Sequence, residues 1–252
     1  MIVEYGADNA AIDFHSRRSV LVGIAAILSC PRVGYSMAEL PVEVAGVTLP
    51  RSVVARKALE FSRAQCPEFL FNHCMRTYLF GAVAMEHHKV PYDANAAFVA
   101  ASLHDLGLVA AFESVGGSFE IDGAERAAQL ARDNGLDSRA VEAVWQAIVL
   151  HDGRFALAEH QGGEAMLVAM GAGSDVLGPD SGVIETRRIE EILEAFPRLQ
   201  FKQRFTALAV EHCKRKPLSQ GGTWLESLCR EEVPSAWTSS LKQQIAAAPF
   251  SE

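Results

Sequence analysis

Residues 96–108, AAFVAASLHDLGL, determine the fold that we expect for this chain. The run is almost wholly apolar, which is typical of a helix that is buried on most sides. It ends in two adjacent polar residues, His104 and Asp105. A buried imidazole and a buried carboxylate both lose hydration unless something pairs with them. A metal ion would pair with both, so this stretch predicts a metal site at the centre of the molecule.

A second apolar segment, residues 68–85, carries its polar side chains on one stripe. Asn72 and Arg76 are four residues apart, and His73 and Thr77 have the same spacing. Such spacings put side chains on one face of a helix. The rest of the segment is apolar nearly all round, which indicates a buried helix. A polar stripe there is a candidate site, although a backbone carbonyl can also satisfy a buried histidine.

Two further apolar segments end in polar residues that could reach the same centre. Residues 138–150 lead to His151, and residues 164–170 lead to Asp175. Taken alone, Asp175 could equally be a turn residue. No segment after Pro50 is a confident strand, and no linker is evident. The pattern therefore predicts an all-α fold, a single helical bundle with the site between buried helices.

The composition excludes several classes of protein. A chain of 252 residues that is 49% hydrophobic can bury a substantial core. The net charge is −8 and no run of Lys or Arg could follow a phosphate backbone, so nucleic-acid binding is disfavoured. The five cysteines lack C-x-x-C spacing, which argues against zinc-ribbon and thioredoxin-type sites. We expect free buried thiols, and we expect His87, His88 and His212 at the surface.

Residues 16–38 have the features of an export signal. Two arginines precede an apolar run at 20–30, and a small-x-small sequence ends at Ala38. The run is too short to span a bilayer but suits a signal peptide. The twin arginine resembles a Tat signal. We therefore expect a signal at 1–38, a mature domain at 39–252 with a C-terminal helical extension, and a periplasmic location. Acidic residues before the arginines favour the alternative, an ordinary N-terminal helix on a cytoplasmic protein.

In chain order, the helix ends present His73, then His104 and Asp105, then His151, then Asp175. This H…HD…D order in helical surroundings resembles the HD-domain superfamily of metal-dependent hydrolases. The surrounding segments are FNHCMRTYLFG, SLHDLGL, FEIDGAERAAQLAR, AIVLHD, SDVLG and PRLQFKQRF. Together they resemble the branch that contains cyanamide hydratase and bacterial relatives of unassigned substrate.

The resemblance implies that one divalent metal ion is held by His73, His104, Asp105 and Asp175. Two imidazoles and two carboxylates suit Zn²⁺ and leave a position for water or substrate. The same ligands would also accept Mn²⁺, Fe²⁺ or Ni²⁺. The resemblance further implies a small-molecule substrate. We expect no segment of the chain to span a membrane stably.

Dinuclear members of the superfamily carry further histidines, the first at the start of the helix after the HD motif. Here residues 119–122 read FEID, and Asp122 is expected to cap the helix that follows. Only His151, or His160 if it swings in, could be an extra ligand. We therefore expect one metal, which also argues against the iron-pair oxygenases.

The leading hypothesis is a hydratase or hydrolase in which metal-activated water adds to a small nitrile-type, cyanamide-like carbon. Asp105 would bind the metal and act on the water, and His151 would donate a proton. Arg76 would orient a ligand carboxylate or meet substrate. The remaining candidates for substrate contact are Asn72, Thr77 and Lys202, although Lys202 could equally be a solvated surface residue.

Two other functions are possible. A metal-dependent phosphohydrolase acting on a nucleotide or phosphomonoester would need several cations at the metal, and only Arg76 can be placed there. A helical binding module without chemistry would leave buried histidines and aspartates unpaired, which is costly.

Overall fold

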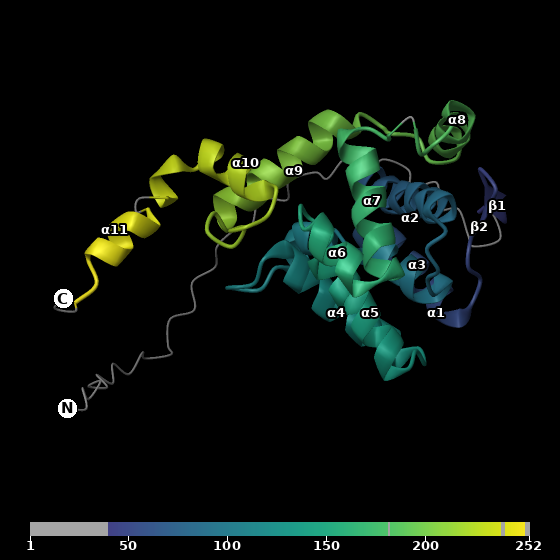
Figure 1. Ribbon diagram of the computed structural model, residues 1–252, viewed down its shortest axis with the longest axis horizontal. Helices are drawn as coiled ribbons and strands as arrows, with labels where there is room; N and C mark the ends of the chain where they lie inside the picture. The colour runs from purple at the N-terminus through teal and green to yellow at the C-terminus, as the bar shows by residue number, and fades with distance from the viewer. Residues whose placement is uncertain (1–39, 181, 238–239, 250–252) are drawn as a thin grey trace, which may run out of the picture. The chain divides into compact units, whose positions relative to one another are not determined.

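The computed structural model describes residues 40–180, 182–237 and 240–249, and within them it contains eleven α-helices and one two-stranded sheet. The predicted all-α class is confirmed. The first elements are β1 (Glu43–Val44), β2 (Val47–Thr48), α1 (Val53–Gln65), α2 (Glu68–His88) and α3 (Ala94–Leu103), followed by the 3₁₀ turns η1 (Leu106–Leu108) and η2 (Ala110–Phe112). Next come α4 (Phe119–Asp133), α5 (Ser138–Val149), α6 (Phe155–Gln161), α7 (Gly163–Leu177) and α8 (Thr186–Ala195). The chain continues through α9 (Phe201–Arg215), α10 (Leu225–Glu232), the turn η3 (Pro234–Ala236) and α11 (Leu241–Ala246) (Figure 1).

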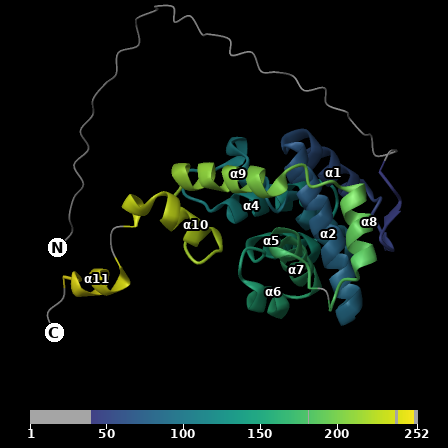
Figure 2. The same ribbon diagram turned by 90° about the horizontal axis from the view of Figure 1, so that it is seen from above.

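Helices α2 and α7 form the centre of the fold and pack closely against each other (Figures 1 and 2). Glycine makes this approach possible. A Cβ at Gly171 on α7 would overlap the carbonyl oxygen of Thr77, and a Cβ at Gly81 on α2 would overlap that of Leu167. The backbones therefore meet without intervening side chains. This contact places the polar stripe of α2 beside Asp175 on α7.

Helix α3 is enclosed by α1, α2, α5 and α7, and residues 96–103 are all buried. Asp93 caps its start by accepting hydrogen bonds from the backbone N–H groups of Asn95 and Ala96. The helix ends at Leu103, so His104 and Asp105 follow it at a buried helix end. The apolar run thus positions the polar pair inside the bundle, as its sequence predicts.

Two helix boundaries differ from those expected. Helix α4 begins at Phe119, so Asp122 lies in its first turn and is not its cap. Asp122 instead accepts hydrogen bonds from the backbone N–H of Ser114 and from Lys216 Nζ, the latter at 2.8 Å. The sequence after Arg154 is polar, which predicts a loop, but it forms the short helix α6, whose Ala158 is buried.

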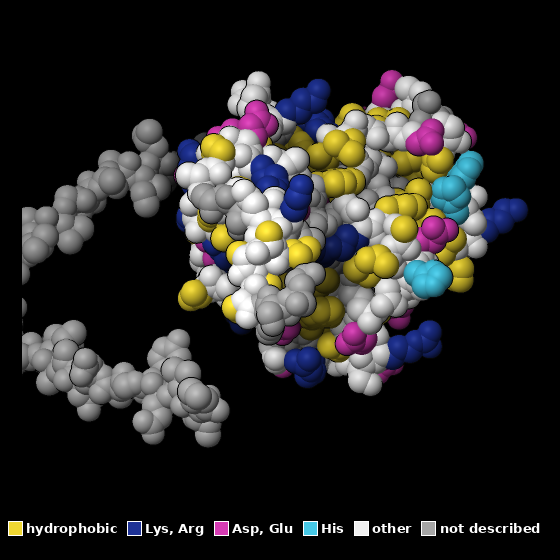
Figure 3. Space-filling model, turned by 60° about the vertical axis from the view of Figure 1, so that its left-hand side comes forward, with side chains coloured by type: hydrophobic (Ala, Val, Ile, Leu, Met, Phe, Trp, Pro, Cys, Tyr) yellow, Lys and Arg dark blue, Asp and Glu magenta, His cyan; other side chains and the backbone are white. Residues whose placement is uncertain are grey.

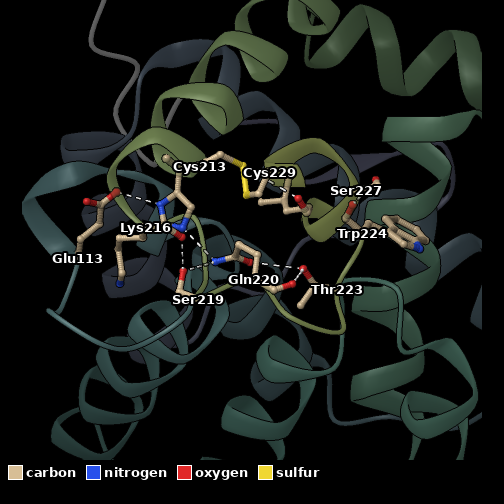
Figure 4. The surroundings of a disulfide bond; sticks show 11 residues. Glu113, Cys213, Lys216, Ser219, Gln220, Thr223, Trp224, Ser227 and Cys229 are labelled. Atoms are coloured by element: carbon tan, nitrogen blue, oxygen red, sulfur yellow. Dashed lines mark hydrogen bonds and ion pairs between the residues drawn. A yellow bond between two sulfur atoms is a disulfide. The ribbon is translucent and has the colours of Figure 1, made fainter. Parts of the chain in front are cut away.

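His212 and two cysteines also correct the sequence analysis. His212 is fully buried, because Glu113 and Gln220 satisfy its two ring nitrogens. Cys213 on α9 and Cys229 on α10 form a disulfide (Figure 4). Cys66 and Cys74 are free and buried, as expected. His87 and His88 are exposed, also as expected.

Two further expectations concern the ends and the membrane. The predicted signal at 1–38 lies outside the described residues. None of the helices in the described ranges combines the length and the apolar character needed to cross a bilayer.

Candidate metal centre

Three side-chain atoms from α2 and the end of α3 face one point inside the bundle. His73 Nε2 lies 3.2 Å from His104 Nε2, and Asp105 Oδ2 lies 3.3 Å from the first and 3.4 Å from the second. All three residues are buried, with at most 1% of their surface exposed. They are the one group of His, Cys, Asp and Glu residues in the described part of the chain with ligand atoms close enough to share an ion.

In His73 and His104, Nδ1 already makes a hydrogen bond, and this bond determines which nitrogen can bind a metal. His104 Nδ1 lies 2.8 Å from the carbonyl oxygen of Ala101, so it must carry the proton and donate. His73 Nδ1 lies 2.7 Å from Asp175 Oδ2 and donates in the same way. With Nδ1 donating, Nε2 is the atom that each neutral ring has left to bind a metal. Burial lowers the pKa of His73, but its bonds to Asp105 and Asp175 raise it, so a metal would bind this ring in competition with a proton.

The charge states also suit a cation. Burial lowers the pKa of His104 to about 3, so this ring is neutral. Burial alone would raise the pKa of Asp105, but His104, His151 and His73 hold it well below its usual range. Asp105 is therefore a carboxylate, and its Oδ2 has no hydrogen-bond partner. An unpaired buried carboxylate oxygen between two imidazole nitrogens is a suitable environment for a divalent ion.

Asp175 lies behind His73 and outside the triad. Its Oδ1 accepts from Arg76 Nε at 2.8 Å and from Arg198 Nη1 at 2.6 Å, and its Oδ2 accepts from Arg76 Nη2 at 2.7 Å as well as from His73. Burial would raise the pKa of Asp175, but its bonds to His73 and Arg76 lower it. The structure thus brings Asp175 to Nδ1 of His73, where it can orient the ring. Its role as a metal ligand stays a prediction.

Arg76 is bonded to the carboxylate of Asp175 and can position that side chain, while contact with substrate stays a prediction. It is fully buried, binds both oxygens of Asp175, and donates from Nη1 to the carbonyl oxygens of Phe196 and Pro197. Arg198, which the sequence analysis missed, adds a second guanidinium to Asp175. Its place in the quoted segment PRLQFKQRF was the available signal.

His151 lies beside the triad. Its Nδ1 donates to the carbonyl oxygen of Ile148 at 2.6 Å, and its Nε2 lies 3.6 Å from Asp105 Oδ1. Burial lowers the pKa of His151, but its close contact with the Asp105 carboxylate and the charge of Asp152 raise it to about 9. The side chain is therefore protonated at neutral pH in the absence of other charges.

Aromatic rings close the site on two sides. The ring of Phe201 stacks on His73 at 4.7 Å between centroids, and Phe205 lies 5.6 Å from the same ring. Phe119 presents its edge to His151 at 5.6 Å. These rings come from α9 and from the start of α4, so those elements limit access of water to the triad.

The remaining predicted residues lie in different environments. Asn72 donates to the carbonyl oxygen of Pro197 at 2.9 Å, which uses its amide in holding the backbone before α9. The Thr77 hydroxyl is buried without a hydrogen-bond partner. Lys202 and His160 are exposed. Substrate contact by Asn72, Thr77 and Lys202 stays a prediction.

Two buried carboxylates near His151 were not identified from the sequence. Glu120 is fully buried and neither of its carboxylate oxygens has a hydrogen-bond partner, and Asp152 has one such oxygen. Burial raises the pKa of both. Glu120 stands in the segment 119–122, where the resemblance implies a histidine in dinuclear members of the superfamily.

The triad fits a divalent ion. Ligand atoms that each lie about 2.0–2.2 Å from one ion are about 3–3.5 Å apart, which is the spacing of the three atoms here. His73, His104 and Asp105 are thus a candidate site for a divalent metal, and residue type alone permits several metals.

Comparison with known proteins agrees with this geometry. Residues 70–176 match the family model described as HD domain, a range that includes the triad, His151 and Asp175. This part of the chain is therefore similar to the HD domain, whose members are generally metal-dependent hydrolases. No curated protein matches the chain.

Proposed function

We propose that this HD-domain chain is a metal-dependent enzyme that adds activated water to a small nitrile-type substrate such as cyanamide, using one ion held by His73, His104 and Asp105. The observation that carries the proposal is the convergence of two histidine Nε2 atoms and one carboxylate oxygen without a hydrogen-bond partner on a single buried point. An ion held there would supply a water acidified toward neutral pH.

We assign the proton transfers of this reaction to Asp105 and His151. Asp105 directs Oδ2 to the triad and Oδ1 toward His151, so it can accept a proton from water and stay near a second proton carrier. His151 is protonated beside the anionic Asp105. A cation in the triad would bring the pKa of His151 down toward neutral pH, where a general acid is most effective. His151 then donates to the nitrogen that becomes negative as water adds.

The charges around the triad favour a neutral or cationic substrate over a phosphate. Both arginines of the site, Arg76 and Arg198, are bonded to Asp175. The carboxylates of Glu120 and Asp152 would repel an anion. On the face shown in Figure 3, Lys and Arg side chains are dispersed among acidic and apolar ones and do not form one continuous basic surface.

Metal analysis and two assays test the proposal. We expect about one ion per purified chain, as in a single tetrahedral site, and urea release from cyanamide without phosphate release from a nucleotide panel. Asp105→Ala removes the carboxylate that completes the triad and should abolish both metal and activity. Asp133→Ala, at an exposed position on α4, is the control. A protein that stays metal-free after addition of Zn²⁺ or Mn²⁺, or an Asp105→Ala variant with full metal content, would contradict the proposal.

We also propose that the protein is exported. The Cys213–Cys229 disulfide supports this, because disulfides persist mainly in oxidising compartments. Cell fractionation should find the protein in the periplasm, and N-terminal sequencing should begin after Ala38. An uncleaved chain in the cytoplasm with free thiols at both positions would contradict export and would leave the proposed reaction unaffected.

A further inference from the structure

Beyond His151, the buried polar region continues into two carboxylates that have no role in the metal centre or in the proposed proton transfers. Glu120 lies in the first turn of α4, is fully buried, and has two carboxylate oxygens without a hydrogen-bond partner. Asp152 follows His151, is 6% exposed, and has one such oxygen, Oδ2. Ser118 interacts with Glu120, and Thr223 and the Leu225 backbone interact with Asp152, but these contacts leave the three oxygens without a hydrogen bond of good geometry. Most buried polar groups in proteins are paired, so the three oxygens indicate a missing partner.

These carboxylates lie close enough to His151 to act on one another. The charges of His151 and Asp152 both act on Glu120, and the charge of Asp105 acts on Asp152. Phe119, the residue before Glu120, contacts the His151 ring. The pair therefore extends the site through His151, whereas the arginines are bonded to Asp175 behind His73.

The chemistry of the missing partner follows from the charges. An isolated buried carboxylate costs several kcal/mol unless a cation or several N–H donors compensate it. Water could bond to the free oxygens but would not neutralise two negative groups. A phosphate or carboxylate ligand would add to the repulsion. A planar group with several N–H donors and a positive charge satisfies carboxylate oxygens in pairs.

We propose that Glu120 and Asp152 form a recognition site for a planar, N–H-bearing nitrogen group of the substrate, of the amidinium or guanidinium class. Cyanamide itself is neutral and linear at carbon, but addition of water to its C≡N bond gives a planar isourea with the N–H donors of an amidine. The inference therefore concerns the group that forms in the proposed reaction and rests on the proposed function. Glu120 and Asp152 bind the nitrogen end of the substrate, and the triad faces the carbon that is attacked.

Calorimetric titration of the full-length protein with acetamidinium chloride, and separately with its neutral isostere acetamide, tests the inference. A charge-assisted hydrogen bond is worth about 1.5–3 kcal/mol, so acetamidinium should bind about tenfold more tightly or better. Glu120→Gln and Asp152→Asn should each remove most of that preference. Glu159→Gln, an exposed carboxylate on α6, is the matched control and should keep it.

Two further measurements separate recognition from structural or metal-binding roles. Glu120→Gln removes an unpaired buried charge, so its melting temperature should equal or exceed that of the wild type, and its metal content should be unchanged. Loss of metal from Glu120→Gln would make Glu120 a metal ligand and overturn the inference. Equal binding of acetamidinium and acetamide by a metal-containing wild type would overturn it and leave the proposed function standing. A metal-free protein that still prefers acetamidinium would support the inference and contradict the proposed function.

Discussion

The chemistry of the triad depends on which ring nitrogen each histidine presents. His104 is oriented by the backbone of its own helix, through the carbonyl oxygen of Ala101. His73 is oriented by a side chain from another helix, Asp175, which is itself held by two arginines. The orientation of the His73 ring is therefore easier to disturb than that of the His104 ring. The orientation of His73 relies on a charged network that a single substitution can break.

Asp175→Asn should weaken metal binding without abolishing it. The amide cannot hold the His73 ring as a carboxylate does, and loss of such a partner typically lowers metal affinity by about 10–100-fold. Competition with a chelator measures the affinity, and metal analysis at saturating Zn²⁺ should still find about one ion per chain. Glu190→Gln, an exposed acid on α8, is the control. If saturating Zn²⁺ fails to load Asp175→Asn, then Asp175 is itself a ligand, as the sequence analysis expects.

Residue spacing predicted part of this network and could not predict the rest. The i, i+3 and i, i+4 spacings placed His73 and Arg76 on one stripe, because they depend only on helix geometry. The separation of Asp175 from the triad depends on how α7 packs on α2 and on where Arg198 folds back. Glu120 was missed because its burial follows from tertiary packing, and a glutamate near a helix start is usually solvated.

Among the secondary-structure elements, the contact of α2 with α7 determines whether the site forms at all. Helix α2 carries His73 and Arg76, and α7 carries Asp175. Their backbones approach at Gly81 and Gly171, where no Cβ can be accommodated. Any side chain there would separate the two helices and lengthen the contacts between His73, Arg76 and Asp175.

Gly171→Ala should therefore destabilise the protein although alanine is the better helix former. Overpacking a close contact typically costs about 1–3 kcal/mol or more, which exceeds the gain in helix propensity of about 1 kcal/mol. Gly173→Ala lies two residues further along α7, where a Cβ would meet only the Trp224 ring at 3.5 Å. It should be neutral or slightly stabilising. Urea unfolding of both variants measures the difference, and equal stability of the two would contradict the close approach.

Apolar patterns in the sequence predict which segments are helical, but they do not predict where each helix begins. The apolar patterns of residues 68–85 and 96–103 indicated buried helices because most of their faces are enclosed. The start of α4 was misplaced because Asp122 has the residue type of a cap but serves a tertiary contact with Lys216. A single sequence does not distinguish an aspartate that caps a helix from one that forms a tertiary ion pair.

At the scale of the whole domain, the segment from α9 to α10 packs on the bundle and also contacts the metal site. Phe201 stacks on His73, while Ala209 and Leu225 pack with Leu108 and Phe119 in a small apolar cluster. The Cys213–Cys229 disulfide closes the chain between these helices, and polar contacts of His212, Gln220 and Lys216 surround it (Figure 4). The covalent link therefore fixes elements that cover one side of the site.

Replacing both cysteines by serine should lower stability while leaving the metal in place. A disulfide that closes a loop of this length, with a sequence separation of 16, contributes about 3 kcal/mol. The triad lies on α2 and at the end of α3, so metal content should be unchanged. Reductant should lower the melting temperature of the wild type and of Cys66→Ala, which keeps the disulfide, but not that of the double serine variant. Faster proteolysis within residues 216–224 of the serine variant would locate the loosening in this segment. Loss of metal on reduction would instead show that α9 and α10 are needed to hold the triad together, because Phe201 and Phe205 of α9 both contact the His73 ring.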